Sequence, residues 1–172
     1  MSNKIYLKNE TGLPTYGGYS NYTGIGINFK NLGLLTAVKI TENSSGGFFQ
    51  ASSSVKTPIE KLSLTSRTRY IFDKPHNGNL KQNITERIAL KYSQNFGKVG
   101  FYEIAGANAN YSVSDGEFKS LSPVSLTGID YKISKNTKIY GEFEISKGFD
   151  LKNNSWNDGV STAIYLGLNI DI

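Results

Sequence analysis

The chain has 172 residues and a formal net charge of +5, with 19% charged, 38% hydrophobic and 12% aromatic residues. Charged residues are scarcer than the roughly 25% of an average soluble domain, and no apolar run approaches the ~20 residues of a membrane-spanning helix. The composition therefore excludes a helical membrane protein, and the absence of cysteine excludes disulfides and thiolate metal sites.

Alternation of apolar and polar residues, with almost no helical periodicity, predicts β-strands along the whole chain. In the first half, connections rich in glycine, proline, serine and asparagine are expected at 11–18, 31–33, 42–47 and 57–60. The strands predicted between them are 4–8, 23–30, 34–40, 49–55 and 61–72.

The second half repeats the pattern. Connections are expected at 73–81, 93–98, 114–117, 134–136 and 147–159. The strands predicted here are 84–92, 101–113, 118–133, 137–146 and 161–172.

One predicted strand, 101–113, changes phase along its length. Tyr102 and Ile104 do not match the alternation of the alanines that follow them. A β-bulge near Gly106 would reconcile the two halves and would keep Glu103 on the polar face.

These patterns predict a single all-β domain over 1–172, an antiparallel up-and-down transmembrane β-barrel of about ten strands (8–10). The expected connections fall into two interleaved sets, short turns on one side and longer loops on the other, as in outer-membrane barrels. An even strand number also places both termini on the short-turn side.

The two faces of the strands decide between lipid and a soluble core. The polar face is rich in glycine, serine and threonine, and such small residues suit a crowded interior rather than a charged, soluble exterior. We therefore expect the apolar face to meet lipid. The residues predicted to face lipid are Ile25, Ile27, Phe29, Leu62, Leu64, Ile139, Phe143, Ile145, Leu166, Leu168 and Ile170.

The same reasoning places charges inside the barrel. Buried charges must be paired, and the basic residues of the polar face lie on strands other than the one that carries the two closing glutamates. The predicted lumen charge network is Arg67, Arg69, Arg87, Lys91, Glu103, Glu142 and Glu144. Basic residues are in slight excess, so the hypothesis is a narrow, weakly anion-selective pore.

The C-terminal region resembles known proteins. The segment "GIDYKISKNTKIYGEFEISKG", followed by "STAIYLGLNIDI", is similar to the closing hairpin and last strand of bacterial outer-membrane barrels such as porins and autotransporter barrels. The resemblance implies a bacterial outer membrane, with membrane lipid or detergent as partner and small ions or solutes in the lumen. Because residues 1–18 show no signal-peptide pattern, the mature form is expected.

Other readings stay open from the sequence. A surface scaffold would use His76, Phe149 and Trp156 in the longer loops to bind a partner. A soluble β-structured virion, tail or binding protein would hide the same apolar face in a core. A lipid-modifying membrane enzyme would use His76 with Asp73, but a solvated loop histidine is the simpler interpretation. We expect no enzyme activity, cofactor, metal site or nucleic-acid partner, and no oligomeric state is predicted.

Overall fold

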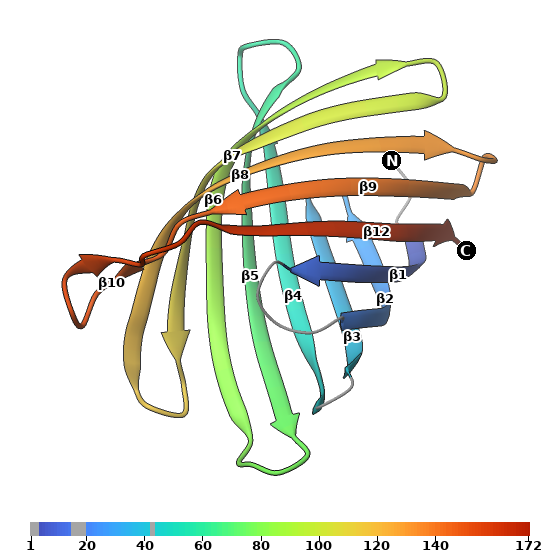
Figure 1. Cartoon of the computed structure of the whole chain (residues 1–172). Helices are drawn as coiled ribbons and strands as arrows, with labels where there is room; N and C mark the ends of the chain where they lie inside the picture. The colour runs from blue at the N-terminus through green and yellow to red at the C-terminus, as the bar shows by residue number, and fades with distance from the viewer. Residues whose placement is uncertain (1–3, 15–19, 42–43) are drawn as a thin grey trace.

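The computed structural model describes residues 4–14, 20–41 and 44–172, and these form an antiparallel β-barrel (Figure 1). In the described part of the chain, no helix is long and apolar enough to cross a membrane. The ten strands of the wall are β1 (Lys4–Pro14), β2 (Ser20–Phe29), β3 (Leu32–Thr41), β4 (Ser44–Lys56), β5 (Leu62–Pro75), β6 (Lys81–Phe96), β7 (Val99–Ser112), β8 (Glu117–Lys132), β9 (Thr137–Ser146) and β12 (Ser161–Asp171).

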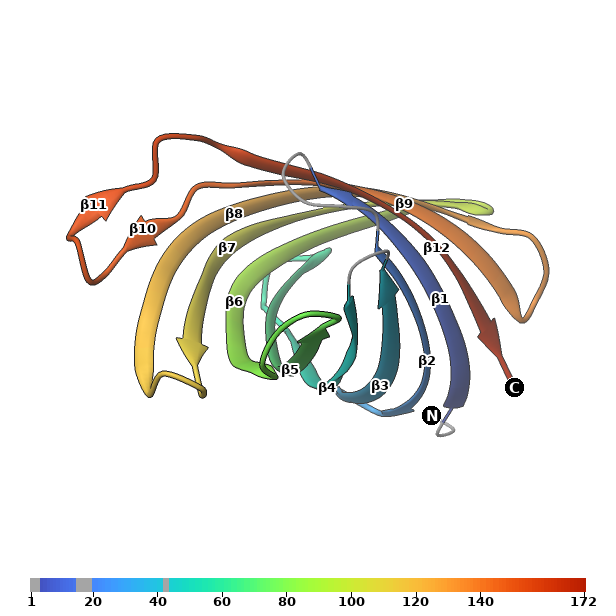
Figure 2. The same cartoon turned by 60° about the horizontal axis from the view of Figure 1, so that its bottom comes forward.

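The barrel is closed by its first and last strands. Strand β1 pairs with β12, β12 pairs with β9, and β9 pairs with β8, so each wall strand has a neighbour on both sides. Closure removes the free sheet edges that would otherwise promote aggregation. Both described chain ends lie at the same end of the barrel, which we call the terminal end, because the number of wall strands is even (Figures 1 and 2).

Two short strands extend the wall at the other end. The predicted loop 147–159 contains β10 (Phe149–Asp150) and β11 (Ser155–Trp156), which pair with each other. Strand β10 also pairs with Leu121 and Ser120 of β8, so it prolongs the sheet beyond the point where β9 ends. Figure 2 shows the β10–β11 hairpin projecting away from the barrel.

The strands are longer than the sequence pattern indicated, and most connections are shorter. Barrel strands reach 16 residues in β6 and β8. The predicted turn 93–98 shrinks to 97–98, where Gly97 adopts a φ of 60°. Part of the predicted loops 11–18 and 42–47 belongs to β1 and β4, and the rest lies outside the described residues.

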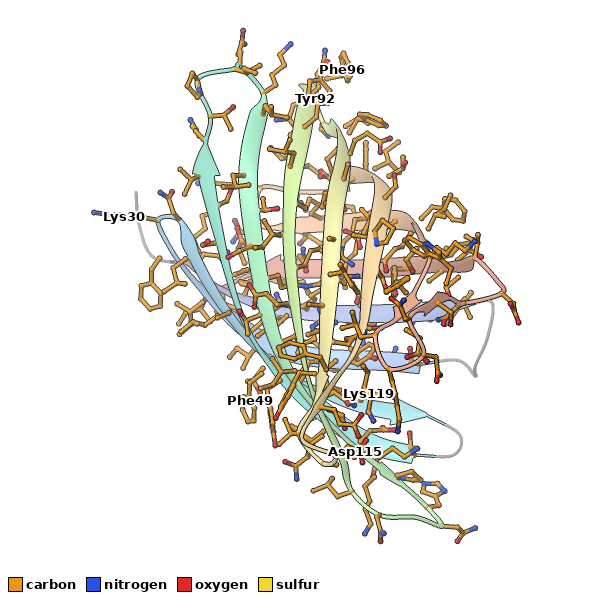
Figure 3. All side chains as sticks on the ribbon, turned by 90° about the vertical axis from the view of Figure 1, so that its left-hand side faces the viewer. Lys30, Phe49, Tyr92, Phe96, Asp115 and Lys119 are labelled. Atoms are coloured by element: carbon orange, nitrogen blue, oxygen red, sulfur yellow. The ribbon has the colours of Figure 1, made fainter. Side chains whose placement is uncertain are left out.

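Apolar side chains cover the outside of the wall. All the residues predicted to face lipid point outward; Leu166, for example, is 55% exposed and Ile25 48%. Aromatic rings lie near the strand ends, with Tyr92 and Phe96 at one end of the barrel and Phe49 toward the other (Figure 3). An exterior this apolar, with aromatic rings near both rims, is typical of a membrane barrel and not of a soluble one.

The predicted bulge near Gly106 is wrong. Register shifts instead between Asn110 and Tyr111, so Ile104 and Gly106 point to the lumen in unbroken alternation. Consequently Glu103 points outward and accepts a 2.8 Å hydrogen bond from Thr127, and its predicted place in the lumen is wrong too.

Candidate functional site

The barrel interior is a polar lumen that contains several cavities. A cavity of about 600 Å³ opens at the terminal end, a second of about 390 Å³ lies near the β2–β3 turn, and a third of about 260 Å³ lies deeper among the charged residues. Gln50 of β4 lines all three.

All three arginines of the chain face this lumen from neighbouring strands β5 and β6. The Nη2 group of Arg87 forms a 2.7 Å ion pair with Glu144, and its Nε donates to Asn108. Arg69 donates from Nε and Nη2 to the amide oxygen of Gln50, and its guanidinium lies 4.2 Å from the centre of the Phe48 ring. The buried Nε of Arg67 has no hydrogen-bond partner among the described residues.

Acidic residues face the arginines from the other side. Glu144 and Glu142 lie on β9, and Glu10 lies on β1. Glu10 accepts hydrogen bonds from the Tyr140 hydroxyl at 2.6 Å and pairs with Lys8 at 2.8 Å. Glu142 accepts a hydrogen bond from the Tyr102 hydroxyl.

The topology shows that these two groups lie across the lumen. In the ring of ten strands, β5 is four positions from both β9 and β1, and β6 is three positions from β9 and five from β1, so none of the acidic strands neighbours an arginine strand. The Arg87–Glu144 pair joins β6 to β9, which are not neighbours in the sheet, so its side chains cross the interior. We call the region between Arg67, Arg69 and Arg87 on one side and the three glutamates on the other the constriction. Its basic and acidic walls produce a transverse electric field.

The remaining predicted lumen residue, Lys91 of β6, also points inward. Its ammonium group lies 4.4 Å from the centre of the Tyr102 ring and makes no ion pair among the described residues. Two further pairs lie at the ends of the lumen, Lys39–Asp73 at 3.2 Å and Lys138–Asp130 at 3.3 Å. The sequence did not single out these pairs.

An apolar cluster inside the barrel was also missed. Leu35, Ala37 and Phe48 are buried, with Tyr22 and Ile71 packed against them. Leu35, Ala37 and Ile71 occupy positions of the predicted polar face. Tyr22 and Phe48 precede the predicted strands 23–30 and 49–55 and are in phase with the same face, so extending the alternation could have found them. The Phe48 ring lies within cation–π distance of the Arg69 guanidinium and stabilises its position.

The residues predicted to bind a partner lie together only in part. His76 belongs to the connection 76–80 between β5 and β6. Phe149 and Trp156 pack edge to face in the β10–β11 hairpin, with ring centres 5.2 Å apart. At the tip of that hairpin, hydrogen bonds from the Asn153 and Lys152 backbones hold Asp150 and lower the pKa of its carboxyl. Among the described residues, no group of histidine, aspartate and glutamate side chains is arranged to hold a metal ion.

Comparison with known proteins yields matches by structure only. No family model and no curated protein sequence matches the chain. The NanC porin superposes with a TM-score of 0.54 at 7% identity, and the match covers 96% of this chain and all of that one. The KdgM porin superposes with a TM-score of 0.52 at 14% identity, covering 97% and 99% of the two chains.

The chain is much shorter than another of its matches. It spans 62% of the length of OmpT, an outer membrane protein of Vibrio cholerae, with a TM-score of 0.42 and 11% identity. The porin matches, in contrast, run over almost the full length of both chains. With the strand pairing and the apolar exterior described above, they show that this chain has the fold of the outer-membrane β-barrels.

Proposed function

We propose that the chain lies in a bacterial outer membrane as a narrow, weakly anion-selective pore. One observation carries the proposal: in a polar lumen, the guanidinium groups of Arg67 and Arg69 have no carboxylate partner among the described ion pairs. In the ion pairs of the lumen, each cation is paired with one carboxylate, so their charges cancel. Around the constriction they leave Arg67, Arg69 and Lys91 against the single carboxylate of Glu142.

The size of the barrel supports a small conductance. About eight strands enclose a space that side chains just fill, whereas wide aqueous channels need 16–18 strands. Ten strands leave little more room, and the Arg87–Glu144 pair crosses what remains. Permeation is therefore expected for small solutes that can move between the two charged walls.

A solved structure of similar fold suggests which solute to test first. The KdgM porin was also solved in complex with disordered oligogalacturonate, and that structure superposes on this chain with a TM-score of 0.55 at 15% identity. Oligogalacturonate is a carboxylate-bearing sugar polymer, so it is a suitable first probe for a lumen with unpaired arginines.

Planar-bilayer recordings in a KCl gradient test the pore. We expect small steps with a reversal potential that indicates anion preference, and partial block by oligogalacturonate. The double variant Arg67→Gln/Arg69→Gln should lose this preference. Lys74→Gln/Lys81→Gln is the matched control, because it removes the same charge at the exposed end of β5 and start of β6. Cation selectivity in the wild type, or an unchanged reversal potential in the arginine variant, would refute the proposal.

A surface scaffold is the second candidate. One observation favours it: Trp156 packs against Phe149 on the projecting β10–β11 hairpin, and 52% of this large apolar residue is still exposed. If the protein is silent in bilayers and loses a binding partner when residues 153–158 are trimmed, the scaffold replaces the pore.

A further inference from the structure

The cavity at the terminal end, which we call the vestibule, differs chemically from the constriction. It has a volume of about 600 Å³ and is formed by β1, β12, the connection 133–136 and the strand ends that flank it. All its cationic residues are lysines, whereas the constriction contains every arginine of the chain. The vestibule is thus a separate candidate site along the same lumen.

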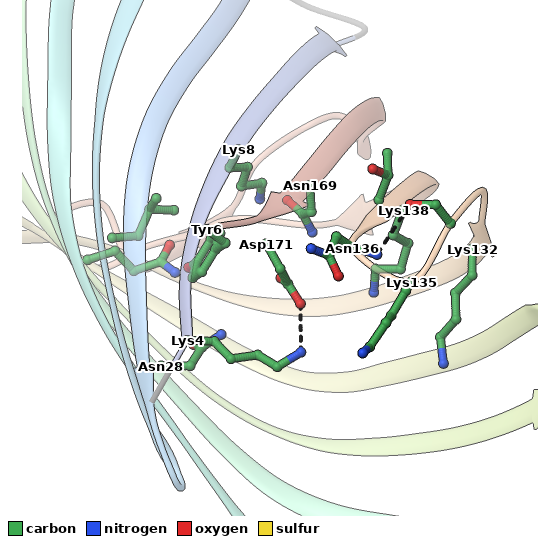
Figure 4. A pocket seen from close by; sticks show the side chains of 14 residues that line it. Lys4, Tyr6, Lys8, Asn28, Lys132, Lys135, Asn136, Lys138, Asn169 and Asp171 are labelled. Carbon is green, nitrogen blue, oxygen red and sulfur yellow. Dashed lines mark hydrogen bonds and ion pairs between the residues drawn. The ribbon is translucent and has the colours of Figure 1, made fainter. Parts of the chain in front are cut away.

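Two of the vestibule lysines carry unbalanced charge. Lys4 pairs with Asp171 at 2.7 Å, and the pairs of Lys8 and Lys138 were described above. Lys132 and Lys135, at the end of β8 and in the connection that follows it, make no ion pair among the described residues. Figure 4 shows both extending their ammonium groups toward the same side as the Lys4–Asp171 pair.

A second, independent feature lies on the adjoining wall of the vestibule, where Asn169 of β12 is the cross-strand partner of Lys138 on β9. The side-chain oxygen of Asn169 on β12 is buried and has no hydrogen-bond partner among the described residues. Leaving a buried polar atom unsatisfied is destabilising, so such atoms are rare in folded proteins. An amide oxygen needs a donor, and a ligand hydroxyl group supplies one.

From these features we infer that the vestibule binds a small phosphate monoester that carries hydroxyl groups, such as a sugar phosphate. Two unpaired ammonium groups balance a dianion, and lysine binds phosphate as a compact point charge. The unpaired Asn169 oxygen would accept a hydrogen bond from a sugar hydroxyl. The volume falls in the range of small-molecule sites. The inference deepens the proposed pore by naming a solute class.

Calorimetry on the folded, detergent-solubilised protein tests this site without requiring conduction. The probes are glucose 6-phosphate, inorganic phosphate and glucose. We expect glucose 6-phosphate to bind more tightly than inorganic phosphate, and glucose to give no measurable heat. Lys132→Gln/Lys135→Gln should weaken glucose 6-phosphate binding at least tenfold. The control Lys56→Gln/Lys98→Gln removes the same charge from exposed lysines outside the cavity and should change binding less than twofold.

Asn169→Ala separates the hydroxyl contact from the charge. It should weaken glucose 6-phosphate several-fold and leave inorganic phosphate unchanged. If Lys132→Gln/Lys135→Gln and the control Lys56→Gln/Lys98→Gln weaken glucose 6-phosphate binding equally, the site is overturned, because diffuse surface charge would then explain binding. Loss of binding in Arg67→Gln/Arg69→Gln but not in Lys132→Gln/Lys135→Gln would overturn it as well, since the anion would then lie in the constriction. Vestibule binding by a protein that is silent in bilayers would support the site and overturn only the pore.

Discussion

At the scale of single residues, the lumen is organised by tyrosines that lie over glycines of the neighbouring strand. In each case the two residues are direct cross-strand partners, and a side chain on the glycine would overlap or crowd the tyrosine ring. Because glycine has no β-carbon, the tyrosine ring can lie flat against the neighbouring strand. The hydroxyls of Tyr102 and Tyr140 donate hydrogen bonds to Glu142 and Glu10. The pairs are Tyr6–Gly26, Tyr102–Gly128, Tyr140–Gly167 and Tyr165–Gly12.

Gly128→Ala should destabilise the barrel by about 1–3 kcal/mol, because the new methyl group overlaps the Tyr102 ring, which is held between Lys91 and Glu142. Gly141→Ala is a matched control in the adjacent strand, since its methyl group would meet Leu166 at an ordinary 3.5 Å. Urea unfolding from lipid vesicles measures both. Equal midpoints for the two variants would show that the tyrosine does not need the glycine.

The Arg87–Glu144 pair gives a second prediction at this scale. Both side chains are largely buried, at 7% and 16% exposure, so a single change leaves one charge without its partner. Arg87→Met or Glu144→Gln alone should cost about 3 kcal/mol, the low end for buried pairs because the neighbouring cavity admits water. The double variant should cost less than the two single changes together. Additive losses in the same unfolding assay would mean that the two groups act independently.

At the scale of the strand, successive side chains point alternately to the lumen and to the exterior, and this direction determines which substitutions each position tolerates. Leu166 on β12 points outward and should face the hydrocarbon of the membrane. Leu166→Arg should therefore cost about 2–4 kcal/mol in vesicles. Ile172→Arg, just past the end of the same strand, should cost about 0–1 kcal/mol because charges near the interface stay hydrated. If both substitutions are equally mild, this face does not lie in lipid.

Alternation also determined how far the sequence could predict the strands. It works in β9 and β12, where isoleucine and leucine face out and glutamate, glycine and asparagine face in. It fails in β7, where alanines face out and Ile104 faces in, so hydrophobicity no longer distinguishes the faces. Because the two faces of β7 do not differ in hydrophobicity, Glu103 was wrongly predicted to face the lumen.

For the lumen site, the sequence predicted several of the residues that face inward but not how they pair. Sequence phase placed the arginines and two glutamates inside, but the pairing of Arg87 with Glu144 rather than Glu142 depends on strand register. Register is set by the turns, whose lengths were overestimated at 93–98 and elsewhere. The vestibule depends on closure, because closure brings the β8–β9 turn next to the ends of β1 and β12.

At the scale of the whole molecule, closure is the feature on which lumen, constriction and vestibule all depend. Strands β1 and β12 are the two ends of the chain, and their pairing joins residues far apart in sequence. The Lys4–Asp171 ion pair and the hydrogen bond from the Ile172 backbone to Ile5 lie on this seam. An open sheet would separate them and expose two long edges.

A disulfide across the seam tests closure directly, because the chain has no cysteine of its own. Leu7 and Ile170 are cross-strand partners that both point outward, so Leu7→Cys/Ile170→Cys should oxidise within one molecule and give a linked pair of peptides after digestion. The control Leu7→Cys/Asn169→Cys places the second thiol one residue away, on the lumen face, where the two β-carbons point apart and cannot be bridged. Cross-linking only between molecules, or equally well in both variants, would show that the barrel is not closed in this register.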